Sequence, residues 1–103
     1  MSDRVIELLA VPAWNTPKTT LDTWVEALRS QGAVVAVERD PPGAWLEVRA
    51  LRLRGYALSE GIALEAINFE LSDPDPEPAT RLLDATAASV GWEIHADDEE
   101  DDD

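Results

Sequence analysis

The chain contains 103 residues, carries a net charge of −14 at pH 7 and has no cysteine. This length predicts a single domain, and the missing thiols exclude disulfides and thiolate metal sites. A surface this acidic repels phosphate backbones, so we expect no direct contact with nucleic acid.

The apolar segments of the chain are short. The first, residues 5–11, is interrupted by Glu7 and is too short for the core of a signal peptide. No stretch approaches the length of a membrane span. We therefore expect a cytoplasmic protein that does not enter a membrane.

Seven of the negative charges lie in the run DDEEDDD at residues 97–103. A block of like charges cannot pack into a core, so we expect one folded domain over residues 1–96 and a disordered acidic tail. The acidic surface has two interpretations, which are simple solubility and a protein partner with a basic surface. We favour solubility.

The first part of the chain predicts a strand, a helix and a second strand. Residues 5–11 form a mostly apolar strand that ends at Pro12, and the following loop places Trp14 at the edge of the core. Residues 33–38 are apolar on both faces, which predicts a strand inside the sheet. Between these strands, residues 19–31 predict a helix with apolar residues at i, i+3, i+4 and i+7: Leu21, Trp24, Val25 and Leu28.

The central stretch, residues 45–71, contains two β-like runs whose alternation changes phase. Residues 45–54 switch their apolar side after Ala50, and residues 62–71 switch it after Ala66. A strand cannot change phase without a bulge or a strong bend. We therefore predict one bent hairpin arm with its tip at residues 55–61. The competing interpretation makes residues 62–71 partly helical, because residues 63–66 have good helix propensity.

The last part predicts a loop, a helix and a short strand. Residues 72–78 alternate prolines with acids, and Asp75 is expected to cap the helix that follows. That helix ends at Gly91, and residues 92–95 form the last strand. Its predicted inner face contains Ala79, Leu82, Leu83, Thr86, Ala87 and Val90.

These elements predict an α+β fold. We expect a two-layer sandwich with two helices on one face of a mixed sheet of four or five strands, close to a ferredoxin-like plait. The dipeptide Gly91-Trp92 and the acidic run DDEEDDD resemble the plan of the acidic plait proteins that inhibit ribonuclease E. The resemblance is one of plan and assigns no functional residue.

The sequence contains no motif that indicates catalysis. Nothing resembles a nucleophile elbow or a glycine-rich phosphate loop, so we expect a protein that is not an enzyme and uses no cofactor. The single histidine, His95, precedes Asp97, Asp98 and Glu99, which together could hold a divalent cation weakly. The simpler interpretation is a strand-end histidine beside solubilising acids, so we assign no catalytic, cofactor or metal residue.

An excess of arginine is the one unusual local feature. Arg49, Arg52 and Arg54 lie within residues 44–57, where Glu47 is the single acid. One interpretation is a site for an anion or a carboxylate. The other, which we favour, is cross-strand pairing of two of these arginines with Glu65 and Glu60.

We therefore expect a small acidic binding or regulatory module that acts through protein–protein contact as a homodimer. The predicted arm has apolar groups on both faces, whereas two helices can cover only one face of a sheet. One alternative is a toxin-neutralising or nuclease-inhibiting protein that presents acids to a basic partner. The other is a weak metal-binding protein or enzyme centred on His95. The expected contact residues are Arg49, Leu51, Arg52, Leu53, Arg54, Tyr56, Ile67 and Phe69.

Overall fold

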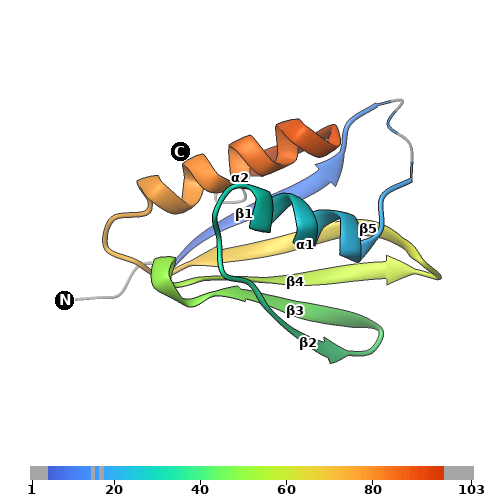
Figure 1. Cartoon of the computed structure of the whole chain (residues 1–103), viewed down its shortest axis with the longest axis horizontal. Helices are drawn as coiled ribbons and strands as arrows, with labels where there is room; N and C mark the ends of the chain where they lie inside the picture. The colour runs from blue at the N-terminus through green and yellow to red at the C-terminus, as the bar shows by residue number, and fades with distance from the viewer. Residues whose placement is uncertain (1–4, 15, 17, 97–103) are drawn as a thin grey trace, which may run out of the picture.

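The computed structural model describes residues 5–14, 16 and 18–96. Within them the chain is an α+β fold in which two helices pack on one face of a six-stranded sheet (Figure 1). This confirms the predicted class. The predicted strand number of four or five is wrong, and the sheet is not mixed, because every strand pair is antiparallel. The predicted acidic tail, residues 97–103, lies outside the described residues.

The strands lie in the order β2-β3-β4-β5-β1-β6. Their bounds are β1 (Ile6–Pro12), β2 (Ala36–Asp40), β3 (Gly43–Val48), β4 (Leu53–Glu60), β5 (Ala63–Leu71) and β6 (Trp92–Ala96). The helices are α1 (Leu21–Ser30) and α2 (Glu77–Val90), and a short 3-10 turn, η1 (Arg49–Leu51), joins β3 to β4. No helix among the described residues is long and apolar enough to cross a membrane.

Helix α1 forms where the apolar periodicity predicts it. The hydroxyl of Thr20 caps its start by accepting a hydrogen bond from the backbone N–H of Thr23, at 3.2 Å. Trp24 and Leu28 are buried, as the predicted apolar face requires. Gly32 follows the helix with a φ of 93°, a left-handed conformation that glycine adopts without strain.

Helix α2 ends at Gly91 as predicted, whereas its N-cap residue is Pro76 and the predicted cap Asp75 lies one residue earlier. The carboxylate of Asp75 accepts a hydrogen bond from the backbone N–H of Glu77 at 3.3 Å, and Gly91 ends the helix with a φ of 78°. Four residues of the predicted inner face are buried, namely Ala79, Leu83, Thr86 and Ala87. Leu82 and Val90 of the same face are half-buried.

The second strand is not inside the sheet. β2 begins three residues later than predicted and lies at the sheet edge, where it pairs with β3 alone and all five of its residues are exposed. The apolar run that suggested a central strand lies mostly in the connection before it. In that connection Val35 is buried, whereas Val34 is 87% exposed.

The predicted hairpin arm does not exist. The phase change in residues 45–54 marks the 3-10 turn η1, which ends one strand and begins the next, so β3 and β4 form a hairpin with each other. Residues 55–60, predicted as part of the arm tip, belong to β4. The strand interpretation of residues 62–71 is confirmed, and its phase change corresponds to a register shift against β4 between Leu58 and Ser59.

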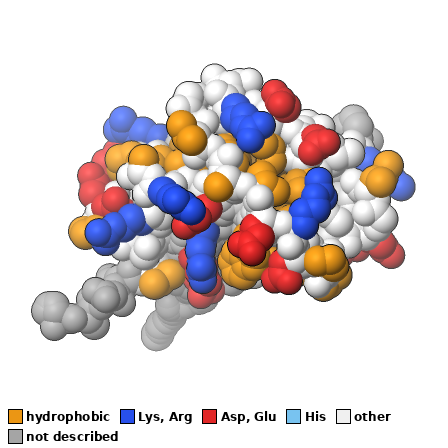
Figure 2. All heavy atoms as spheres, turned by 60° about the horizontal axis from the view of Figure 1, so that its bottom comes forward, with side chains coloured by type: hydrophobic (Ala, Val, Ile, Leu, Met, Phe, Trp, Pro, Cys, Tyr) orange, Lys and Arg blue, Asp and Glu red, His pale blue; other side chains and the backbone are white. Residues whose placement is uncertain are grey.

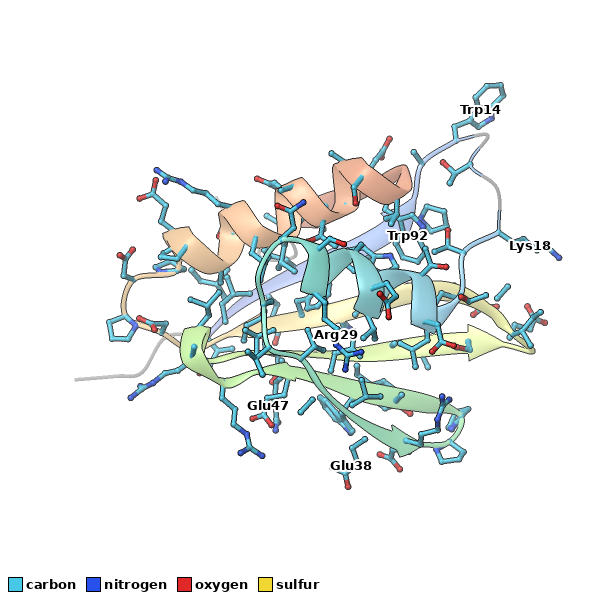
Figure 3. The ribbon with its side chains drawn as sticks, viewed as in Figure 1. Trp14, Lys18, Arg29, Glu38, Glu47 and Trp92 are labelled. Carbon is cyan, nitrogen blue, oxygen red and sulfur yellow. The ribbon has the colours of Figure 1, made fainter. Side chains whose placement is uncertain are left out.

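Three aromatic rings form the centre of the core. The ring centroid of Trp24 lies 5.8 Å from that of Phe69 and 5.5 Å from that of Trp92, which connects α1 with β5 and β6. Figure 3 shows Trp92 inside the molecule, near α1 and α2, and Trp14 projecting away from it. The prediction that Trp14 packs at the core edge is wrong, because this residue is 90% exposed.

Candidate functional site

The structure brings the three predicted arginines together around η1. Arg49 belongs to that turn, Arg52 follows it and Arg54 lies on β4. They border a hollow of about 400 Å³. The other residues that line it are Val5, Glu47, Leu53, Glu70 and Ser72. We refer to this hollow as the arginine hollow.

Two of the arginines form ion pairs, although not the predicted ones. The Nε of Arg49 lies 3.3 Å from a carboxylate oxygen of Glu47, and the Nε of Arg54 lies 3.3 Å from one of Glu70. The predicted pairing with Glu65 and Glu60 is wrong, because the register places Arg54 directly opposite Glu70. All four of these side chains are more than a third exposed, so each pair is a weak contribution to stability.

Arg52 has a different role in the turn. Its φ is 50°, which is left-handed, and its backbone carbonyl accepts hydrogen bonds from the N–H of Ser72 at 3.1 Å and from the Ser72 hydroxyl at 3.3 Å. Its guanidinium forms no salt bridge with any residue that the structure describes. The arginine hollow therefore contains one guanidinium that is not matched to a described carboxylate.

The other predicted contact residues separate into two groups. Leu53, Ile67 and Phe69 are 2%, 0% and 1% exposed, so their side chains belong to the monomer core and offer no contact surface. Leu51 is half-buried beside η1. Tyr56 is half-buried on the uncovered sheet face, where its hydroxyl donates a hydrogen bond to the backbone carbonyl of Asp40 at 2.9 Å.

A second and larger hollow, which we call the groove, lies on the helix side of η1. It has a volume of about 880 Å³ and shares Glu47 and Arg49 with the arginine hollow. Val35 and Val48 are its buried apolar residues, and Val34 is exposed at its rim. The remaining lining residues are Gln31, Gly32, Ala33, Ala36, Ala50, Leu51, Pro78, Arg81, Leu82 and Ala85.

The groove exists because α1 ends early. A helix of ten residues spans about 15 Å, and the chain then turns at Gly32 and crosses to the sheet edge. The first turns of α2, the segment at residues 31–36 and η1 surround the space that remains (Figure 1). Sequence reasoning missed the groove because its three walls are far apart in the chain. The one local signal is the apolar run at residues 33–36, which the sequence pattern predicts as part of a strand inside the sheet at residues 33–38.

Figure 2 brings the lower edge of the molecule in Figure 1 forward. Basic side chains alternate with acidic ones across this view, and hydrophobic side chains reach the surface between them. This face of the molecule therefore offers apolar contact and charges of both signs. That combination suits contact with another protein more than burial of a bare ion.

The sheet face opposite the helices is rich in carboxylates. The cross-strand register places Glu47, Arg54, Glu70 and Glu7 in one row across β3, β4, β5 and β1. Further acids on this face are Glu38, Asp40 and Glu93. The face also holds Trp45, whose ring centroid lies 4.9 Å from that of Tyr56 and 4.7 Å from the Arg54 guanidinium carbon.

His95 lies on β6 and has one carboxylate neighbour. Its Nε2 is 3.1 Å from a carboxylate oxygen of Glu93. Among the described residues, no three histidine, aspartate or glutamate side chains come together in a way that could hold a metal ion. The acids predicted to join His95 lie in residues 97–103, outside the described part of the chain.

No known protein family matches this chain, and no curated protein is significantly similar to it. The groove, the arginine hollow and the acidic sheet face are therefore the features of the described residues that bear on function.

Proposed function

We propose that this protein is a small non-catalytic binding module that acts through protein–protein contact, and that the groove beside η1 is its contact site. The groove is the observation that supports this function best. It combines about 880 Å³ of open space, a mainly apolar lining and an exposed valine at its rim. Exposed apolar side chains gathered in one hollow suit a site that another molecule covers.

The composition of the groove favours binding over chemistry. Its ionisable lining residues are two arginines and one glutamate, Arg49, Arg81 and Glu47. Arginine stays protonated at any physiological pH and does not serve as a general base. The Glu47 carboxylate is already paired with Arg49 at 3.3 Å. These groups suit recognition of a partner.

Site-specific photo-cross-linking tests this proposal. A photoreactive residue at position 34, at the rim of the groove, should form an adduct with a protein in the native lysate. The matched control is position 62, since Ile62 is 85% exposed and Val34 is 87% exposed, but Ile62 lies outside the groove at the β4–β5 turn. Equal adducts from both positions, or none from position 34, would contradict the proposal.

A basic partner for the acidic sheet face is the second candidate. The six carboxylates on that face, opposed there by Arg54, support an inhibitor-like protein that presents acids to a basic surface. Such a complex should weaken steeply with salt, because exposed charges are screened. If the Glu70→Lys variant bound the basic partner as tightly as the wild type does, this candidate function would be contradicted.

The homodimer predicted from the sequence stays part of the proposal. Sedimentation of the full chain at micromolar concentration tests it, and a monomer at every concentration would contradict it. Three residues of the predicted dimer contact are buried in the monomer core and cannot take part in it: Leu53, Ile67 and Phe69. The remaining predicted contact residues are exposed or half-buried: Arg49, Leu51, Arg52, Arg54 and Tyr56.

We also propose that the core of the fold is a ferredoxin-like plait. The strand order β4-β5-β1-β6, with α1 after β1 and α2 after β5, supports this interpretation. The edge hairpin of β2 and β3 would then be an addition to the plait. This hairpin supplies Ala36, Glu47 and Val48 to the groove, so the addition would carry part of the proposed contact site.

A further inference from the structure

The groove lies in the helix layer, in the space beyond the last turn of α1. Helix α2 has 14 residues and spans about 21 Å, whereas α1 spans about 15 Å. One wall of the groove is therefore α2 with no helix facing it. Along this wall α2 presents Pro78, Arg81, Leu82 and Ala85, which have the spacing i, i+3, i+4 and i+7 of a helix-packing face.

The exposure of the lining indicates a macromolecular occupant rather than an enclosed small molecule. Val34, Ala50, Pro78 and Ala85 are all exposed apolar residues of the groove, whereas Val35 and Val48 are buried beneath it. A small ligand usually has most of its own surface enclosed by a pocket. This groove is open along one side, and a helix laid into it would cover those exposed residues together.

The charge of the lining residues indicates which charge the bound partner should carry. Two arginines and one glutamate give the groove a charge of +1, in a chain whose net charge is −14. Arg49 pairs with Glu47 at 3.3 Å and Arg81 pairs with Glu77 at 2.8 Å. Both arginine side chains are at least 77% exposed, so these pairs are weak and their guanidinium groups can accept a further carboxylate.

We infer that the groove binds an amphipathic helix of a partner protein, with its apolar face against Val34 and Leu82 and its acidic flank against Arg49 and Arg81. The inference rests on the proposed function, because it names the chemistry of the partner at the same site. The acidic flank of such a helix complements the two exposed guanidinium groups of the groove, Arg49 and Arg81. A basic helix would place like charges against both arginines.

Binding of designed peptides tests this inference. The probes are three labelled peptides of about 16 residues, long enough to form a helix when bound. The first has leucines at i, i+3, i+4 and i+7 with glutamates elsewhere, the second has lysines in place of the glutamates, and the third is a scrambled form of the first. Fluorescence anisotropy with the full chain should show the glutamate peptide binding at least about tenfold more tightly than either of the others.

Two sets of variants locate the binding. Val34→Glu should weaken binding of the glutamate peptide by about tenfold or more, whereas the matched control Ile62→Glu should change it less than about twofold. Both positions are more than 80% exposed, so neither variant should unfold the protein, which circular dichroism checks. The double variant Arg49→Glu/Arg81→Glu should invert the preference and bind the lysine peptide more tightly. The control for this charge reversal is Arg39→Glu, on β2 outside the groove lining.

The outcomes separate this inference from the proposed function. Tighter binding of the lysine peptide to the wild type, or no binding of any peptide, would overturn the acidic-helix partner. If position 34 still cross-linked to a protein, the proposed function would stand without it. If the wild type sedimented as a dimer that Val34→Glu dissociated, a second copy would be the occupant, and the inference would again be overturned.

Discussion

Trp92 and Thr19 are 73 residues apart in the sequence and meet in the core. The indole Nε1 of Trp92 donates a buried hydrogen bond to the hydroxyl oxygen of Thr19 at 3.0 Å. This contact joins the first residue of β6 to the segment just before α1. It satisfies the polar end of an otherwise apolar ring and so permits a tryptophan at this position.

Removing the acceptor should therefore cost stability. Thr19→Val keeps the shape of the side chain but leaves the indole N–H buried and unpaired, which should cost about 1–3 kcal/mol of the free energy of unfolding. Urea unfolding measures this change. Thr19→Ser, which retains the hydroxyl, is the control and should cost less. An equal loss in both variants would mean that the threonine methyl group matters more than the hydrogen bond.

The packing of α1 gives a second prediction. Leu28 is 1% exposed in the core, so Leu28→Ala should lower the free energy of unfolding by about 2–4 kcal/mol. Leu58 is 41% exposed on β4, and Leu58→Ala is the matched control that should cost much less. Thermal or urea unfolding compares the two. Similar losses would show that the face of α1 is not the buried one.

Gly55 gives a third prediction, because it lies opposite Phe69 on the helix side of the sheet. A Cβ added at this position would lie 2.5 Å from Cδ1 of the Phe69 ring, closer than real contacts allow. Gly55→Ala should therefore destabilise the protein by about 1–3 kcal/mol through overpacking.

A double-mutant cycle tests the cause of that loss. Phe69→Leu removes the ring, so Gly55→Ala should cost less in the Phe69→Leu background than in the wild type. Additive losses would mean that the ring is not the obstacle and that the Ile67 side chain, whose Cγ2 would lie 3.0 Å from the added Cβ, causes the loss.

The turn between β4 and β5 gives a prediction about pH. The neighbouring Glu60 carboxylate raises the pKa of Glu65 above its ordinary value, because it accepts a hydrogen bond from the protonated Glu65 carboxyl and its negative charge disfavours ionisation of Glu65. The native state therefore binds this proton more tightly than the unfolded state. The resulting contribution to stability is present at low pH and is lost as the pH rises through the folded pKa of Glu65.

Glu60→Gln should lower the pKa of Glu65, because it removes the like charge. A side-chain carboxyl NMR titration of both proteins measures this shift directly. Glu38→Gln, on the distant edge strand β2, is the control and should leave the pKa of Glu65 unchanged. An unchanged pKa in Glu60→Gln would show that Glu60 is not the cause.

The amino-acid sequence predicts correctly those local elements whose signals are contained in a few neighbouring residues. The periodicity of Leu21, Trp24, Val25 and Leu28 gave α1, because one helical face must be apolar to pack. Gly91 marked the end of α2, since a left-handed residue there favours glycine. The alternation in residues 62–71 indicated a strand, and its phase change corresponded to a real irregularity in the register.

The positions of those elements in the sheet depend on contacts between residues that are far apart in the chain. The apolar run at residues 33–38 could precede an edge strand or form a central strand. Its sequence does not distinguish the two, because the strands that would flank it come from residues far away in the chain. The phase change in residues 45–54 could mean a bulge or a turn, and pairing with Leu53 and the residues after it made it a turn. The partner of Arg54 became Glu70 through the register of β4 against β5.

The groove and the arginine hollow also depend on tertiary structure. The lining of the groove comes from the residues that follow α1, the segment before β2, η1 and the first turns of α2. The lining of the arginine hollow comes mainly from β3, η1, β4 and the end of β5. Local periodicity reports which face of an element is apolar, but it does not report where a covering helix ends. Which apolar surface remains uncovered therefore depends on how the helices pack on the sheet. In this protein, the positions of α1 and α2 on the sheet leave the groove uncovered.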